Sequence, residues 1–159
     1  MSVLADVLLH ADSSLSRGER ELIAAYVSAL NECDFCHNSH AAVASCHLGD
    51  EGATVTAVVR DAYSAPVSPK MKALLAIAGR VQRNGREVRD ADISRARAEG
   101  ATDIEIHDTV LIAAAFCMFN RYVDGLGAPT PADPDGYRER ARYVAEHGYA
   151  AILPQLRVR

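Results

Sequence analysis

Hydrophobic residues recur along this chain with the three-to-four-residue spacing of helices that bury one face. The first clear example follows Ser16 and Glu19, whose spacing is that of a helix-capping box. The apolar positions after this cap keep a helical period: Leu22, Ile23, Tyr26, Val27 and Leu30. The pattern predicts a helix that ends at Asn31-Glu32.

The same reasoning, with Gly and Pro as helix ends, predicts most of the remaining chain. We expect helices over residues 34–47, 53–63, 69–83, 90–99, 103–126 and 137–146, and a short helical piece over 3–9. A loop over 125–136 and a tail over 149–159 complete the chain, and no strand pattern stands out. We therefore predict an all-α, single-domain bundle of about six to seven helices over residues 1–159.

Residues 110–119 are apolar on every side of the longest predicted helix. Such a segment is typical of a buried central helix or of one shared with another subunit, so we expect a homo-oligomer. The run is too short to span a bilayer. The N-terminus lacks the basic region and long apolar core of a signal peptide, and we expect a cytoplasmic protein with no membrane association.

Composition narrows the function classes. Hydrophobic residues make up 49% of the chain, with 6% aromatics and no tryptophan, which suits closely packed helices. The net charge of −4 gives no electrostatic reason to expect nucleic acid as a partner. Four cysteines in 159 residues are too few for a disulfide framework.

Candidate chemistry gathers at the start of the helix predicted over 34–47. Cys33 and Cys36 are three apart, so their Cα separation falls within the range of roughly 4.4–6.8 Å seen across disulfides. His40 lies four residues after Cys36 and shares its helix face, so it can serve as a base for the thiol. A helix N-terminus favours the thiolate and is expected to lower the cysteine pKa. The stretch is typical of a dithiol redox centre.

Two other chemistries fit parts of this stretch. Cys33, Cys36, His37 and His40 form one helical stripe, but four ligands on one straight helix cannot surround a tetrahedral zinc, and we predict no metal. Cys33 to His37 also matches the c-type haem attachment pattern. Haem attachment of this kind normally occurs outside the cytoplasm, so we predict no cofactor.

The arrangement of Glu21, Cys33-x-x-Cys36 and His40 resembles the active-site pattern of alkylhydroperoxidase D-like proteins in the carboxymuconolactone decarboxylase superfamily. Residues 105–127 are similar to the long helix of the peroxidase-related branch. The resemblance implies an all-α oligomer, a trimer or hexamer. It also implies a thiol peroxidase that reduces hydroperoxides and is regenerated by a dithiol or thioredoxin-like reductant.

The resemblance further implies that Cys36 attacks the peroxide, Cys33 resolves the product to a disulfide, and Glu21 and His40 relay protons. The helix dipole alone favours Cys33 as nucleophile, but a base within reach is worth more, and we assign Cys36. Helical geometry lends Glu21 independent support, because a chain reversal near residue 31 lets Glu21 and His40 face each other. This sequence has Phe35 where relatives carry a second histidine.

Other chemistry-bearing residues are expected in structural roles. We place His37 at the rim of the site, Cys117 in the core, and Cys46 away from the redox pair. Four residues of the longest helix are expected to fix helix packing or a subunit contact: His107, Asn120, Arg121 and Asp124. The alternative functions are a redox-sensing or small-molecule-binding oligomer, and a decarboxylase-type enzyme on the same helices.

Overall fold

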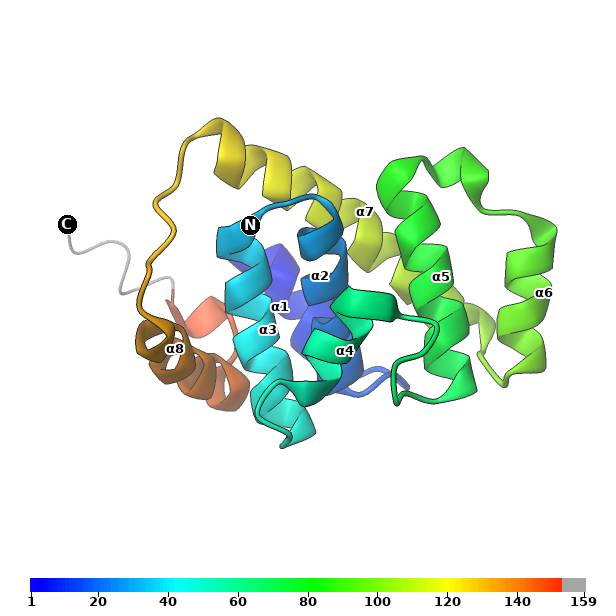
Figure 1. Ribbon diagram of the computed structural model, residues 1–159, viewed down its shortest axis with the longest axis horizontal. Helices are drawn as coiled ribbons and strands as arrows, with labels where there is room; N and C mark the ends of the chain where they lie inside the picture. Colours follow the sequence, from blue (N-terminus) through cyan, green and yellow to red (C-terminus); the bar gives the residue numbers. More distant parts are fainter. Residues whose placement is uncertain (153–159) are drawn as a thin grey trace.

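A computed structural model describes residues 1–152 of the chain. Within them the protein is entirely helical, with eight α-helices and two short 3-10 helices (Figure 1). In chain order these are α1 (Ser2–His10), α2 (Arg17–Leu30), α3 (Asp34–Leu48), α4 (Ala53–Asp61), α5 (Pro69–Arg83), η1 (Gly85–Glu87), α6 (Asp90–Ala98), α7 (Asp103–Gly125), α8 (Pro134–His147) and η2 (Ala150–Ile152).

The predicted all-α class is confirmed, with eight helices rather than six to seven. The main boundary error is at α8, which begins at Pro134 and not at 137. Asp133 accepts a hydrogen bond from the backbone N–H of Asp135, and Pro134 occupies the first helical position, so the proline-rich loop itself starts the helix. Of the predicted tail, residues 150–152 form η2, and residues 153–159 lie outside the described part.

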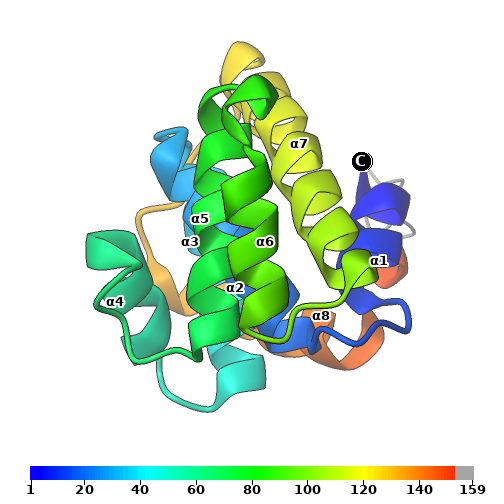
Figure 2. The ribbon, with the colours of Figure 1, turned by 90° about the vertical axis from the view of Figure 1, so that its right-hand side faces the viewer.

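Helix α2 lies at the centre of the bundle and packs against α1, α3, α4, α5 and α7 (Figures 1 and 2). Its predicted capping box is present: Ser16 Oγ accepts from the Glu19 N–H at 3.2 Å, and Glu19 Oε2 accepts from the Ser16 N–H at 2.8 Å. Leu22, Ile23 and Val27 on the apolar face of α2 are fully buried, and each such side chain contributes about 1.5–3 kcal/mol. Small residues allow close approach, since a Cβ at Gly18 would lie only 3.0 Å from Leu48 Cδ2.

The turn between α2 and α3 presents the two cysteines. Glu32 adopts a left-handed backbone with φ of 57°. The Cys33 N–H donates to the Ser28 carbonyl at 3.1 Å and the Glu32 N–H to the Ala29 carbonyl at 3.0 Å, which together form a Schellman motif. A non-glycine residue in this conformation costs roughly 1–2 kcal/mol. The turn ends α2 where the sequence predicted and leaves Cys33 as the N-cap of α3.

One face of the molecule carries exposed apolar side chains. Along α7, Ile104, Leu111 and Met118 are spaced by seven residues and are 57%, 43% and 53% exposed. Helix α1 packs beside α7 and adds Val3 and Val7, also exposed (Figure 2). The all-round apolar segment of α7 thus buries one side against the core and leaves the other uncovered. We call these five residues the α1/α7 face.

None of the helices within residues 1–152 combines the length and the apolar character needed to cross a bilayer.

Candidate active site

The two cysteines of the predicted redox motif are three residues apart in the sequence, and both are buried. Cys33 is 1% exposed and Cys36, in the first turn of α3, is 5% exposed, and both are free thiols. Two polar residues of α7 approach them: Asp124 interacts with Cys33, and Asn120 with Cys36. The dithiol therefore lies between the start of α3 and the C-terminal part of α7.

Burial raises the pKa of both thiols, and the two differ in what else acts on them. For Cys33 the rise is large, and a hydrogen bond to Asp124 adds to it because that bond requires the protonated thiol. For Cys36, hydrogen bonds from the Cys33 thiol and the Asn120 amide work against burial and lower its pKa. These differences favour Cys36 as the thiol that ionises first.

The helix N-terminus was predicted to lower the pKa of the cysteines, and this is wrong because the pKa of each thiol is raised overall. The helix dipole contributes about 0.3–1 kcal/mol at an exposed site, and the loss of solvent around a buried thiolate outweighs it here. Cys33, which the helix dipole alone would favour, is also the less exposed of the two thiols. Thiolate formation in this site requires a proton acceptor.

Glu21 and His40 meet as the helical geometry predicted. The Oε2 atom of Glu21 lies 2.8 Å from His40 Nδ1, and the carboxylate, in the N-terminal half of α2, is fully buried. Burial opposes ionisation of Glu21, but the interactions with His40, His10 and Tyr149 outweigh it and lower the pKa of Glu21. An ionised carboxylate only accepts hydrogen bonds, so Nδ1 of His40 carries the proton. Its Nε2 is then free to take another, as a base must.

Two further residues that contact Glu21 were not predicted from the sequence. The Tyr149 hydroxyl donates to Glu21 Oε1 at 2.9 Å and lies 2.9 Å from His40 Nδ1. His10, at the end of α1, places Nε2 3.4 Å from the same Oε1. Both come from segments more than ten residues from Glu21 in the chain, with no local motif to mark them, so only the tertiary fold reveals them.

Gly148 and Asp6 set the position of Tyr149. Gly148 ends α8 with φ of 80°, and the Tyr149 N–H donates to Asp6 Oδ1 at 2.6 Å. A Cβ at Gly148 would collide with the Asp6 carboxylate. The first helix and the last turn of α8 are thereby fastened together, and this directs the phenol toward Glu21.

A buried amide network supports the α7 side of the dithiol. Asn120 Oδ1 accepts from Asn31 Nδ2 at 2.8 Å, and Asn120 Nδ2 donates to Ser28 Oγ at 3.1 Å. Gln82 of α5 completes it by donating to Asn31 Oδ1 at 2.9 Å. The predicted packing role of Asn120 is present, and the structure adds its interaction with Cys36. Asp124 was also expected to make a packing or subunit contact, and it interacts instead with the Cys33 thiol of the site.

The remaining candidates lie away from the thiols or are tied to other groups. His37 Nδ1 donates to the Ala25 carbonyl at 3.0 Å, which fixes its ring against α2. His107 is exposed beside Asp108, and Arg121 donates to the Cys117 carbonyl one turn back at 2.8 Å. Cys117 is half-buried rather than in the core.

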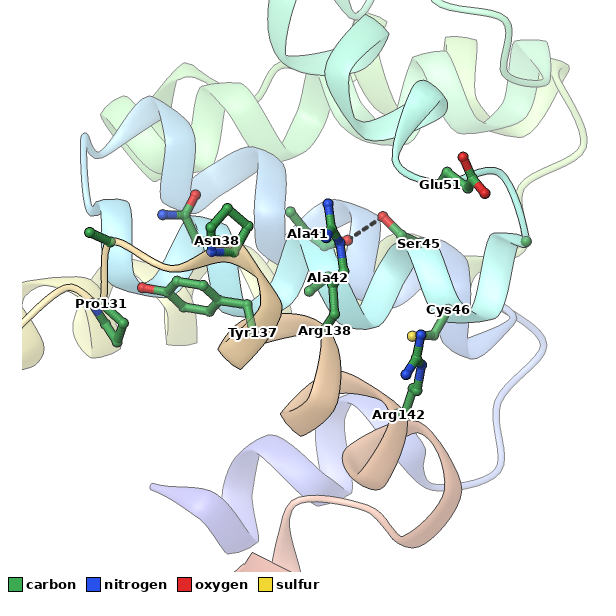
Figure 3. A pocket seen from close by; sticks show the side chains of 13 residues that line it. Asn38, Ala41, Ala42, Ser45, Cys46, Glu51, Pro131, Tyr137, Arg138 and Arg142 are labelled. Atoms are coloured by element: carbon green, nitrogen blue, oxygen red, sulfur yellow. Dashed lines mark hydrogen bonds between the residues drawn. The ribbon is translucent and has the colours of Figure 1, made fainter.

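A cavity lies on the opposite side of α3 from Glu21, between α3 and α8 (Figure 3). Its volume is about 750 Å³, and the exposed thiol of Cys46 and the guanidinium groups of Arg138 and Arg142 line it. Neither redox cysteine lines this cavity. Cys46 is therefore separate from the dithiol, as the helical register predicted.

In the part of the chain described, no three His, Cys, Asp or Glu side chains are gathered in a way that would hold a metal ion. The two histidines of the helical stripe from Cys33 to His40 have separate partners: His37 is hydrogen-bonded to a backbone carbonyl and His40 to Glu21. The chemistry available at the site is that of thiols, a carboxylate, an imidazole and a phenol.

Comparison with known proteins agrees with the predicted resemblance. Residues 2–80 match the carboxymuconolactone decarboxylase family. A solved structure from Ralstonia eutropha JMP134, described as an alkylhydroperoxidase core and an uncharacterized peroxidase-related protein, is 29% identical. It superposes with a TM-score of 0.76 over 86% of this chain and 70% of that one. An uncharacterized peroxidase-related protein from Silicibacter sp. TM1040 is 28% identical, with a TM-score of 0.77 over 86% and 69% of the two chains. No curated protein matches the chain.

The lowered pKa of Glu21 predicts how stability depends on pH. A carboxylate with a lowered pKa in the folded state stabilises the fold above the ordinary glutamate pKa of about 4.3, and this contribution is lost as the pH falls through the lowered value. At pH 7, Glu21→Gln should lower the free energy of unfolding by about 1–3 kcal/mol, because it leaves buried donors unpaired. Urea unfolding at several pH values measures this.

The difference between parent and Glu21→Gln should shrink as the pH drops below about 4. Glu139→Gln, at an exposed position on α8, is the matched control and should leave unfolding unchanged at every pH. A difference that stays constant from pH 7 to pH 3 would contradict an ionised Glu21.

Proposed function

We propose that this chain, which has the alkylhydroperoxidase D-like fold and matches the carboxymuconolactone decarboxylase family, is a thiol-dependent peroxidase that reduces hydroperoxides through a Cys33–Cys36 cycle. The observation that carries the proposal is the buried pair of Glu21 on α2 and His40 on α3, 2.8 Å apart, with His40 on the helix that begins at the two cysteines. Such a pair supplies the proton acceptor that thiols with a raised pKa require.

The proposed oxidation has two steps. The Cys36 sulfur attacks a peroxide oxygen, so that an S–O bond forms and the O–O bond breaks. The alkoxide takes up a proton to leave as an alcohol, and Cys36 becomes a sulfenic acid. The Cys33 sulfur then attacks the Cys36 sulfur; the disulfide forms, and the sulfenic hydroxyl leaves as water with the proton of Cys33.

Protons move through His40 in both steps. His40 Nε2 accepts the Cys36 proton and returns it to the departing alkoxide, while Glu21 holds the ring by Nδ1 and stabilises its positive charge. An external dithiol or thioredoxin-like protein, itself oxidised to a disulfide, returns two electrons and two protons to Cys33 and Cys36. We place this cycle in the cytoplasm, where such donors keep dithiols reduced.

Two other functions each have an observation in their favour. The cavity of about 750 Å³ beside α8 favours a small-molecule-binding protein whose dithiol only senses redox state. The matched family's description favours a decarboxylase. A sensor loses its two thiols once and does not turn over excess peroxide. A decarboxylase keeps its activity when both cysteines are replaced by serine.

A stoichiometric peroxide pulse tests the function and the order of the cysteines together. The parent should lose two thiols, regain them with a dithiol, and turn over excess peroxide in the presence of that dithiol. Cys33→Ser should accumulate sulfenic acid on Cys36 that a trapping reagent captures, whereas Cys36→Ser should stay largely unreacted. The reverse pattern would exchange the two roles, and no loss of thiols in the parent would remove the peroxidase function.

His40 should matter most at neutral pH. His40→Ala should slow oxidation of the dithiol by about 10²-fold at pH 7, since it removes the proton acceptor. The deficit should narrow as the pH rises, because the raised pKa of Cys36 is then approached and the thiolate forms without a base. Stopped-flow oxidation from pH 6 to 10 measures both effects.

His37→Ala is the control for His40→Ala on the same helix, since its Nδ1 is occupied by the Ala25 carbonyl. It should oxidise at close to the parent rate. If His40→Ala were as fast as the parent at pH 7, the base assignment would be wrong.

We also propose a homo-oligomer, a trimer or hexamer, that covers the α1/α7 face. Light scattering of the parent should then give three or six times 17.1 kDa. Leu111→Glu, in the middle of the α7 stripe, should shift the protein toward single chains, because a carboxylate cannot be buried there without a partner. Tyr63→Glu, at an exposed position beside α4, should leave the mass unchanged. A parent that is monomeric at micromolar concentration would contradict the proposal.

A further inference from the structure

Four side chains form one continuous file through the centre of the molecule. His40 Nδ1 lies 2.9 Å from the Tyr149 oxygen, and the Tyr149 hydroxyl donates to Glu21 Oε1 at 2.9 Å. The same Oε1 lies 3.4 Å from His10 Nε2. A single carboxylate oxygen therefore touches both the tyrosine on one side and a second histidine on the other.

His10 stands at the far end of this file from the dithiol. Its side chain is only 6% exposed, and its buried Nε2 has no hydrogen-bond partner among the described residues but lies 3.4 Å from Glu21 Oε1. The ring also lines an open cavity of about 250 Å³ between α1 and the end of α8. The charged or titratable groups that share this cavity are Asp6, Arg17, Glu146 and His147. His10 thus lies between a buried carboxylate and the solvent side of the molecule.

We propose that His10 is a proton-carrying positioning residue, which connects Glu21 and His40 to the cavity between α1 and α8 through the Tyr149 hydroxyl. The use of this route by the dithiol rests on the proposed peroxidase function. The route itself is defined by the contacts of His10, Glu21 and Tyr149 alone.

Each group along the route gains one proton and gives one up. When His40 Nε2 accepts a proton from the Cys36 thiol, Nδ1 passes its own proton to the Tyr149 oxygen. The Tyr149 hydroxyl gives its proton to Glu21 Oε1, and Oε1 passes one to His10 Nε2. His10 Nε2 takes this proton as the acceptor nitrogen of a neutral ring, and His10 Nδ1 releases its own proton to water in the cavity. The net result is the movement of one proton from thiol to solvent, and the reverse sequence brings one back.

Tyr149 is suited to relay protons without ionising. Burial, and then the negative charge of Glu21, raise the pKa of Tyr149 well above its ordinary value, so the hydroxyl keeps a proton at all times. Its contacts on both sides are of hydrogen-bond length. The phenol can therefore accept from one neighbour only as it donates to the other.

His47 of α3 provides a matched control inside the same cluster. Its ring lies edge-on to that of His10, with centroids 5.7 Å apart, and its Nε2 is buried and unpartnered within the described residues. Burial lowers the pKa of His47. His47 thus resembles His10 in type and surroundings, but of these two histidines only His10 lies within ion-pair distance of Glu21.

The route is tested by proton exchange, without peroxide. In reduced protein labelled with ¹⁵N-histidine, magnetisation transfer from water measures how fast the His40 Nδ1 proton exchanges, with the signal assigned through a His40→Gln variant. His10→Gln and Tyr149→Phe should each slow this exchange by about 10²-fold, the low end of what a positioned proton carrier contributes. His47→Gln should leave it at the parent rate.

Exchange in His10→Gln as fast as in the parent would overturn the route. Equal slowing in His47→Gln would also overturn it, because the effect would then be one of general packing. Tyr149→Phe removes a single oxygen and keeps the test available if His10→Gln does not fold. Because exchange needs no substrate, a protein that lacks peroxide turnover but shows the predicted exchange would overturn the proposed function alone.

Discussion

The ionised carboxylate of Glu21, fully buried on the central helix α2, is the constraint on which the rest of the site depends. A buried charge without partners would be far too costly, so the fold must bring polar groups to it. Three separate segments do so: α3 brings His40, α1 brings His10, and the turn after α8 brings Tyr149. Packing of both ends of the chain onto α2 is thereby coupled to the ionisation of one side chain.

The dithiol shows the opposite balance between burial and polar contacts. Cys33 and Cys36 sit at a helix N-terminus, where the backbone favours a negative charge, yet burial dominates and their pKa values rise. Reduced thiols of this kind are unreactive until a base removes a proton. In the proposed function, reactivity is controlled by His40 and its support rather than by the cysteines alone, and Asn120 favours Cys36 because it lowers the pKa of that thiol.

Local patterns explain what the sequence could predict. The capping box at Ser16, the break at Asn31-Glu32 and the spacing from Cys36 to His40 all act within a few residues, and the structure has each of them where expected. Glu21 was identified by the resemblance to a known active-site pattern, and the geometry of two facing helices supported it. Tyr149 and His10 carry no such signal, since their approach to Glu21 depends on how α1 and α8 dock and on the collision-free turn at Gly148. The pKa of the thiols was misjudged because burial is a property of the whole fold.

Infrared difference spectroscopy tests the ionisation of Glu21 most directly. Subtracting the spectrum of reduced Glu21→Gln from that of the reduced parent at neutral pH isolates the vibrations of this one carboxyl group. An ionised Glu21 predicts the paired symmetric and antisymmetric bands of a carboxylate, unchanged well below the ordinary pKa of glutamate. A single carbonyl band of a protonated carboxylic acid at neutral pH would contradict the account, because Glu21 would then carry no negative charge for His40, Tyr149 and His10 to stabilise.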